Sequence, residues 1–124
     1  GGHHTTNFDA ASVEQARQAL EAQGLRPSIM VDCSHDNSGK QPERQPEVLQ
    51  AVIDQALDPA SPVMGAMLES NLVGGRQALP VDLSKLVPGQ SVTDACIDWE
   101  TTESALTDAW QRLEQRMASA RPMA

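Results

Sequence analysis

The sequence is poor in aromatic residues: its 124 residues include two tryptophans, one phenylalanine and no tyrosine. This scarcity argues against a surface where aromatic rings stack on nucleic-acid bases, and we predict that Trp110 lies in the core or in an interface instead. Cysteine is also scarce. Cys33 and Cys96 could pair, but two cysteines are not the dense framework of a disulfide-stabilised secreted domain. We therefore predict two reduced thiols and a cytoplasmic location.

Long apolar runs and an excess of positive charge are both absent. No stretch approaches the roughly 18 apolar residues that cross a bilayer, and the N-terminus has no apolar signal segment. Nine lysines and arginines against 17 aspartates and glutamates give a formal net charge of -8, which repels phosphate backbones. We predict neither a membrane partner nor a nucleic-acid partner. The chain begins at Gly1 instead of methionine, which suggests a processed or truncated product.

The main positive feature of the sequence is a repeated pattern in which polar residues follow an apolar run. Ile29-Met30-Val31 precedes the polar stretch 32–37, and Val63–Leu68 precedes Glu69-Ser70-Asn71. A third polar cluster, Ser91–Cys96, lies farther along the chain. Short apolar runs of this kind are typical of buried parallel strands, and barrel enzymes carry functional side chains at the C-terminal ends of such strands. We therefore expect the functional groups at these strand ends.

The apolar patterns predict three helices that alternate with two strands. The order is a helix at Ser12–Gln23, a strand at Ser28–Cys33, a helix from Pro46 to Leu57, a strand at Val63–Leu68 and a helix at Thr102–Ala120. The connection 70–100 shows no strong periodicity, and connections of that length are usually functional or act as lids. Ser12 and Gln15 have the spacing of a capping box. The last helix has an apolar stripe made of Leu106, Ala109, Trp110, Leu113 and Met117.

These elements predict an α/β fold that is incomplete. Two parallel strands with three helices cannot close a core, because a parallel sheet needs both faces covered and a two-stranded sheet has two open edges. The alternation fits the C-terminal part of a TIM (β/α)8 barrel, whose full length is roughly 250 residues. Residues 1–124 would then form one segment of a single barrel domain.

Three side chains, His35, Glu69 and Asp94, are the candidates for chemistry. Mixed nitrogen and oxygen ligands suit a divalent ion such as Mn, Fe, Co or Zn. Each residue also has a structural interpretation: His35 as a hydrogen-bonded residue at a strand end, Glu69 as a paired carboxylate, and Asp94 as an Asx turn or helix cap. Spacing by itself leaves both interpretations open.

Two cationic stretches are weaker candidates. Gly39-Lys40 is similar to the end of a P-loop, but the earlier glycine and the following serine or threonine are missing, which rejects that motif. Lys40 is then either close to a substrate phosphate or a solvated loop lysine. Gly74-Gly75-Arg76 either grips an anion through backbone amides or forms a flexible turn.

Three stretches, VDCSHDNSGKQ, GAMLESNLVGGRQ and QSVTDACIDWE, together resemble the C-terminal part of class I 3-deoxy-D-arabino-heptulosonate 7-phosphate (DAHP) synthase. They occur in the family's order and at its approximate spacing, and the resemblance runs through nearly the whole chain. It implies a TIM barrel and a metal-dependent transferase, 3-deoxy-7-phosphoheptulonate synthase. That enzyme opens the shikimate pathway to the aromatic amino acids.

The resemblance also implies a role for each candidate residue. The histidine of SH-x-N-S-x-K, the glutamate of M-x-E-S and the aspartate of T-D-A-C-I are metal ligands in the family, and they match His35, Glu69 and Asp94. The family's fourth ligand is a cysteine from an earlier part of the barrel, so we assign Cys33 and Cys96 to packing.

For intact family members the resemblance implies an aldol-like condensation of phosphoenolpyruvate with erythrose 4-phosphate. The metal would polarise the aldehyde carbonyl as a Lewis acid, and His35 and Asp94 would also act as catalytic residues that move protons. Asp32 or Asn37 would fix the tautomer of His35. We also predict a homo-oligomer.

Much of the family's substrate-binding equipment falls outside this sequence. Gly1-Gly2 matches a glycine pair of the family, and the arginine before that pair, which contacts phosphoenolpyruvate, would precede Gly1. A chain with three of four metal ligands and few substrate-binding cations is expected to be inactive alone. The alternative hypothesis is therefore a catalytically inactive barrel fragment that is stabilised by self-association.

Overall fold

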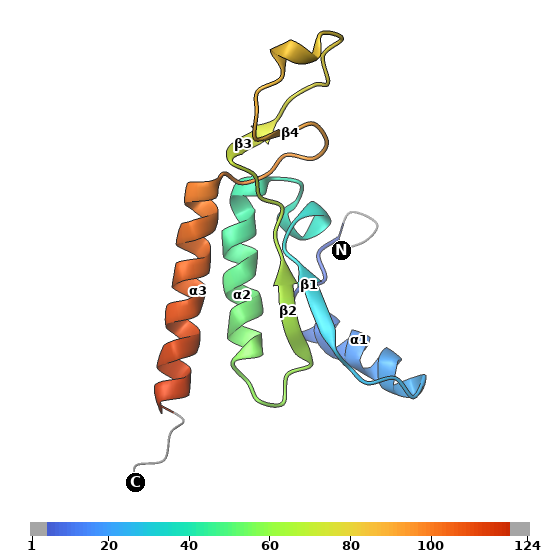
Figure 1. Cartoon of the computed structure of the whole chain (residues 1–124). Helices are drawn as coiled ribbons and strands as arrows, with labels where there is room; N and C mark the ends of the chain where they lie inside the picture. Colours follow the sequence, from blue (N-terminus) through green and yellow to red (C-terminus); the bar gives the residue numbers. More distant parts are fainter. Residues whose placement is uncertain (1–4, 120–124) are drawn as a thin grey trace.

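The structure is a computed structural model that describes residues 5–119, so the Gly1-Gly2 pair lies outside the described residues. Within that range the chain forms three α-helices and four strands (Figure 1). In chain order they are α1 (Ala10–Ala22), β1 (Ile29–Asp32), α2 (Gln45–Ala56), β2 (Val63–Met67), β3 (Val73–Arg76), β4 (Gln90–Ser91) and α3 (Trp99–Ser119). Short 3-10 helices occupy His35–Ser38, Pro42–Arg44 and Leu83–Lys85.

The predicted strand–helix–strand unit is confirmed. β1 and β2 are parallel neighbours, with Val31 opposite Ala66 and Asp32 opposite Met67. The backbone ladder between them ends where the Cys33 N–H donates to the Met67 carbonyl at 2.9 Å. Because the strands are parallel, the residues that follow them lie at the same end of the sheet.

The helices form a layer beside this sheet. Figure 1 shows α2 and α3 side by side, with α2 between α3 and β2, while α1 contacts β1. Val48, Leu49 and Val52 of α2 are at most 4% exposed, because their spacing places them on one face of the helix. Cys33 is fully buried in the same core, which confirms its predicted packing role. The other buried members of this core are Val13, Val31 and Ala109.

The connection after Glu69 is more structured than predicted. It contains β3 and β4, which pair in parallel as a second two-stranded sheet, so the prediction of two strands was wrong. These strands are four and two residues long, and the pairing register shifts at Gly74-Gly75 within the first. Strands this short do not show the alternation of apolar and polar residues from which a strand is predicted. Figure 1 shows the small sheet beyond the end of the β1–β2 sheet.

Two details of the helices also differ from prediction. The N-cap of α1 is Asp9, which accepts a hydrogen bond from the Ser12 N–H at 3.0 Å, so Ser12 is not the cap. In α3 only Ala109 of the predicted stripe is buried, and Trp110 is 57% exposed. The helix packs on α2 through smaller residues, which leaves Leu106 and Met117 exposed as well. Across residues 5–119 no helix has the length and apolar character of a membrane span.

Candidate metal centre

The segment that carries His35 makes a sharp turn after β1. His35 has a φ of 50°, in the left-handed region that residues other than glycine seldom adopt. Its carbonyl accepts hydrogen bonds from the Lys40 N–H at 2.7 Å and from the Ser38 hydroxyl at 3.1 Å. Gly39, at a φ of 62°, lets the chain complete this tight loop. The loop therefore holds an unfavourable backbone conformation in place and sets the direction of the imidazole.

Asp32 and Ser34 orient the ring of His35. One oxygen of the Asp32 carboxylate accepts the Ser34 N–H at 2.8 Å, and the other lies 2.7 Å from His35 Nδ1. The Ser34 hydroxyl is also 2.8 Å from Nδ1. A carboxylate beside Nδ1 favours a proton there, which leaves the lone pair of Nε2 for a ligand. Of the two predicted partners of His35, the structure selects Asp32.

Asn37, the other predicted partner, has a different contact set. Its side-chain amide donates to the Asp32 carbonyl at 2.8 Å and to Asn7 Oδ1 at 2.9 Å, and its oxygen accepts the Asn7 N–H at 2.7 Å. Asn37 therefore ties the segment before α1 to the end of β1 and does not contact the imidazole.

Glu69 and Asp94 come together through backbone pairing beyond β2. The Ile97 N–H donates to the Glu69 carbonyl at 3.0 Å, and the Asn71 N–H donates to the Ile97 carbonyl at 3.0 Å. Gly75 and Cys96 exchange two further backbone hydrogen bonds at 2.8 and 3.1 Å. These contacts lay the segment around Ile97 beside the end of β2, and they place Asp94 close to Glu69.

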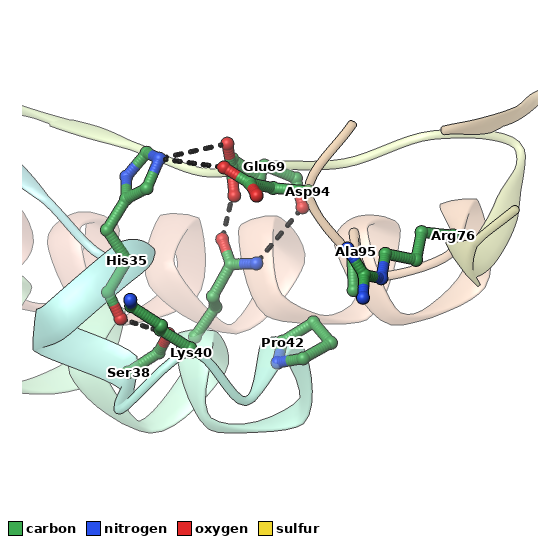
Figure 2. Close-up of a pocket in the computed structure, with 9 residues that line it drawn as sticks. His35, Ser38, Lys40, Pro42, Glu69, Arg76, Asp94 and Ala95 are labelled. Atoms are coloured by element: carbon green, nitrogen blue, oxygen red, sulfur yellow. Dashed lines mark hydrogen bonds and ion pairs between the residues drawn. The ribbon is translucent and has the colours of Figure 1, made fainter. Parts of the chain in front are cut away.

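The three predicted residues meet at one point. His35 Nε2 lies 3.4 Å from Glu69 Oε1 and 3.4 Å from Asp94 Oδ2, and one ligand atom from each residue lies within 4.8 Å of the others. Figure 2 shows the imidazole facing both carboxylates across the top of a cavity. The Glu69 side chain is 25% exposed and the Asp94 side chain 65%, so the cluster is open to solvent.

Charge couples the members of this cluster. The hydrogen bond that His35 donates to the Asp32 carboxylate raises the pKa of His35, partial desolvation opposes the rise, and the negative charges of Glu69 and Asp94 add to it. Partial burial opposes ionisation of Asp32, but hydrogen bonds from Ser34 and His35 outweigh it and lower the Asp32 pKa. The site thus concentrates negative charge around one imidazole.

This donor set fits a divalent cation. One imidazole nitrogen and two carboxylate oxygens are ligands that Mn, Fe, Co and Zn share. Metal bonds of about 2.0–2.2 Å place two ligands of one ion roughly 3–4 Å apart, and the 3.4 Å separations of this cluster agree with that spacing.

The cavity below the cluster has a volume of about 360 Å³. Lys40 and Arg76, the two cationic candidates of the sequence, both line it together with His35, Glu69 and Asp94. Among the described residues neither cationic side chain has an ion-pair partner. The cavity therefore combines an acidic cation site with two available positive charges.

Sequence reasoning missed Gln45, which also lines this cavity and bonds the main chain of Glu69. A glutamine before a proline in a polar loop gives no signal of burial, yet Gln45 is 1% exposed. Its partner is 24 residues away along the chain, so no local pattern could have identified it.

The fold and the site together define an α/β protein with a candidate divalent-cation site at the ends of two parallel strands. The family model described as the DAHP synthetase I family matches residues 1–107. The chain belongs to this family.

Named proteins with similar sequences support that assignment. A phospho-2-dehydro-3-deoxyheptonate aldolase of Alternaria alternata is 47% identical over 109 residues, which cover 87% of this chain and 29% of the relative. The Tyr-sensitive enzyme of the same name from Escherichia coli is 42% identical over 118 residues, which cover 95% of this chain and 33% of the relative.

A solved structure supports it as well. The phospho-2-dehydro-3-deoxyheptonate aldolase of Francisella tularensis superposes with a TM-score of 0.83 at 34% identity, covering 94% of this chain and 33% of that one. The chain thus spans about a third of the length of these three proteins.

Proposed function

We propose that this chain is the C-terminal segment of a TIM-barrel DAHP synthase, with residues 1–124 forming one part of a single domain. The proposed reaction is the metal-dependent condensation of phosphoenolpyruvate with erythrose 4-phosphate in the cytoplasm, carried out by a homo-oligomer. The observation that carries the proposal is the convergence of His35, Glu69 and Asp94 within 4.8 Å. Family membership over residues 1–107 agrees with it.

In this proposal His35, Glu69 and Asp94 hold the divalent ion, which is Mn, Fe, Co or Zn. A bound ion would supply Lewis acidity toward an aldehyde carbonyl oxygen. Asp32 keeps the proton of the imidazole on Nδ1, so that Nε2 faces the two carboxylates. His35 and Asp94, the more exposed members, also serve as the proton-transfer groups of the site.

The two cations of the cavity suit phosphorylated substrates. Lys40 and Arg76 line the same cavity as the acidic cluster. An ammonium and a guanidinium that have no carboxylate partner within residues 5–119 are available to bind the phosphate or carboxylate groups of both substrates. The carbon–carbon bond between the two substrates would form in this cavity, which Ser38 and Gln45 also line.

A second candidate function is an inactive barrel fragment that persists by self-association. The observation that favours it is apolar exposure on the strands: Met30 is 62% exposed and Met64 is 68% exposed. Parallel strands are normally covered on both faces. In this hypothesis the chain alone turns over no substrate.

The test measures phosphoenolpyruvate consumption in the presence of erythrose 4-phosphate and Mn²⁺. One sample is the purified chain, and the other is a chimera in which this chain replaces the matching segment of the Escherichia coli relative. We expect no turnover by the chain and turnover by the chimera. His35→Ala and Glu69→Ala should each abolish it, whereas Glu47→Ala, which removes an exposed carboxylate of α2, should not.

An inactive chimera that is folded would contradict the enzymatic proposal and leave the fragment hypothesis. Turnover by the chain alone would contradict the fragment hypothesis. Full activity of the Glu69→Ala chimera would contradict the assigned metal ligands.

A further inference from the structure

The buried side chain of Gln45 forms two hydrogen bonds with one other residue, Glu69. Gln45 is the first residue of α2, and it is 1% exposed. Its Nε2 donates to the Glu69 carbonyl at 3.1 Å, and its Oε1 accepts the Glu69 N–H at 2.7 Å. Burying an amide is unfavourable unless its polar atoms are hydrogen bonded, and here Glu69 provides the partner for both ends.

This contact begins where the sheet stops. The last rung between β1 and β2 joins the Cys33 N–H to the Met67 carbonyl. Beyond it the chain after β1 turns away toward His35, so Glu69 lies past the end of the ladder. The planar amide of Gln45 occupies the position of a neighbouring strand residue, since it exchanges both hydrogen bonds with Glu69 as a closely spaced antiparallel pair does.

The two hydrogen bonds of Glu69 to Gln45 are not equivalent. The Glu69 carbonyl has a second donor, because the Ile97 N–H bonds it at 3.0 Å. For the Glu69 N–H, Gln45 is the partner that the structure provides. Loss of Gln45 would therefore leave the carbonyl held from one side, and it would free the N–H.

We propose that Gln45 is a positioning residue that holds the main chain of Glu69 and thereby aims its carboxylate at His35. The Glu69 carboxylate reaches within 3.4 Å of His35 Nε2, and a small rotation of its backbone would move that oxygen away. The inference rests on the proposed function, because it concerns Glu69 as a metal ligand. It adds a residue outside the ligand set on which the affinity for the ion depends.

The first experiment tests the contact without any metal. Amide hydrogen exchange of the full chain is compared for the wild type and Gln45→Met, which keeps the side-chain length and removes both polar atoms. We expect the Glu69 amide to exchange at least roughly tenfold faster in the variant, while the Cys33 amide in the sheet keeps its rate. Gln45→Glu retains an acceptor for the Glu69 N–H, and it should restore protection of that amide.

The second experiment measures the dissociation constant for Mn²⁺. We expect Gln45→Met to raise it about 10- to 100-fold, as loss of a supporting contact around a metal ligand typically does. Gln55→Met is the matched control. Gln55 also belongs to α2 and bonds a distant carbonyl, that of Phe8, at 2.7 Å, away from the site. This control should leave the Mn²⁺ affinity unchanged, and circular dichroism verifies that both variants are folded.

An unchanged exchange rate of the Glu69 amide in Gln45→Met would overturn the inference. So would an unchanged Mn²⁺ affinity, or an equal loss of affinity in Gln55→Met. Two results together would contradict the proposed function instead: the wild-type chain binds no Mn²⁺, and every ligand variant of the chimera keeps its activity. The exchange rate of Glu69 would then still decide whether Gln45 holds its main chain.

Discussion

The two thiols of the chain lie in different environments. Cys33 directly follows β1 and is fully buried, and this burial raises the pKa of its thiol to about 12, with a further contribution from Asp32. Cys96 is only partly buried, beside the small β3–β4 sheet. Alkylating reagents react with the thiolate, so burial protects Cys33 both by removing access and by suppressing ionisation.

We predict that a Cys96→Ser variant resists iodoacetamide at pH 8 while it is folded. The thiolate fraction of Cys33 at that pH should be far below that of an ordinary cysteine, because burial raises its pKa. Mass spectrometry should find no label on the native variant and one label per chain in guanidinium chloride. Rapid labelling of the native variant would show that Cys33 is not in the core.

The hydrogen bond between Asp32 and His35 supplies a second prediction at this scale. Asp32→Asn keeps the shape of the side chain but removes the charged acceptor beside Nδ1. We expect the Mn²⁺ dissociation constant to rise about 10- to 100-fold in a calorimetric titration. Asp36→Asn makes the same change of charge next to His35, where the structure shows no side-chain contact with the ring. Equal affinities for the two variants would argue against orientation by Asp32.

The N-cap of helix α1 is a titratable residue, Asp9. Hydrogen bonds from the Ser12 hydroxyl and N–H lower the pKa of Asp9 below its ordinary value of 3.8. A lowered folded-state pKa means that the carboxylate stabilises the fold above that ordinary value, and that this contribution is lost as the pH falls through the folded pKa. The cap also satisfies an N–H that the helix itself leaves without a partner.

We therefore predict that Asp9→Ala lowers the Tm of the chain at pH 7 and that the difference from the wild type shrinks as the pH falls below the ordinary pKa of 3.8. Asp9→Asn is the control, because asparagine caps a helix without titrating. Thermal unfolding followed by circular dichroism over this pH range measures the effect. A difference that stays constant as the pH falls from 7 to well below 3.8 would mean that the charge of Asp9 contributes nothing.

At the scale of elements, prediction was most accurate where apolar residues were dense. The runs beginning at Ile29 and Val63 became β1 and β2, and the apolar face from Val48 to Leu57 became most of α2. It was least accurate for β3 and β4, which are held by pairing of their main chains and by Gln77, whose side chain bonds the Val87 and Gln90 carbonyls. Main-chain pairing between short polar segments has no sequence period to detect.

For the molecule as a whole, exposed apolar side chains on the strands predict association. Met30 and Met64 are both more than 60% exposed on the β1–β2 sheet. We expect sedimentation of the chain to show a mass above 13.3 kDa that increases with concentration.

Substitutions can distinguish association through the β1–β2 sheet from nonspecific hydrophobic association. Met30→Lys combined with Met64→Lys should shift the chain toward the monomer, because charge on the sheet opposes pairing. Leu25→Lys, which changes a residue that is 56% exposed between α1 and β1, should not. A monomeric wild-type chain at all concentrations would contradict the fragment hypothesis in its self-associating form.

The sequence by itself determined the alternation of helices and strands and the family, and it named His35, Glu69 and Asp94 as candidate metal ligands. Apolar runs and short motifs carry that information locally. Only the tertiary structure decided that these residues meet, that Asp32 orients the imidazole, and that Gln45 bonds Glu69. Asp32 and His35 are only three residues apart, but the meeting of the three candidate ligands and the contact of Gln45 with Glu69 join segments far apart in the chain. The pairing of β1, β2 and the segment around Ile97 brings those distant segments together. No local period or spacing encodes such pairing, because it depends on which main-chain groups remain without partners once the strands end.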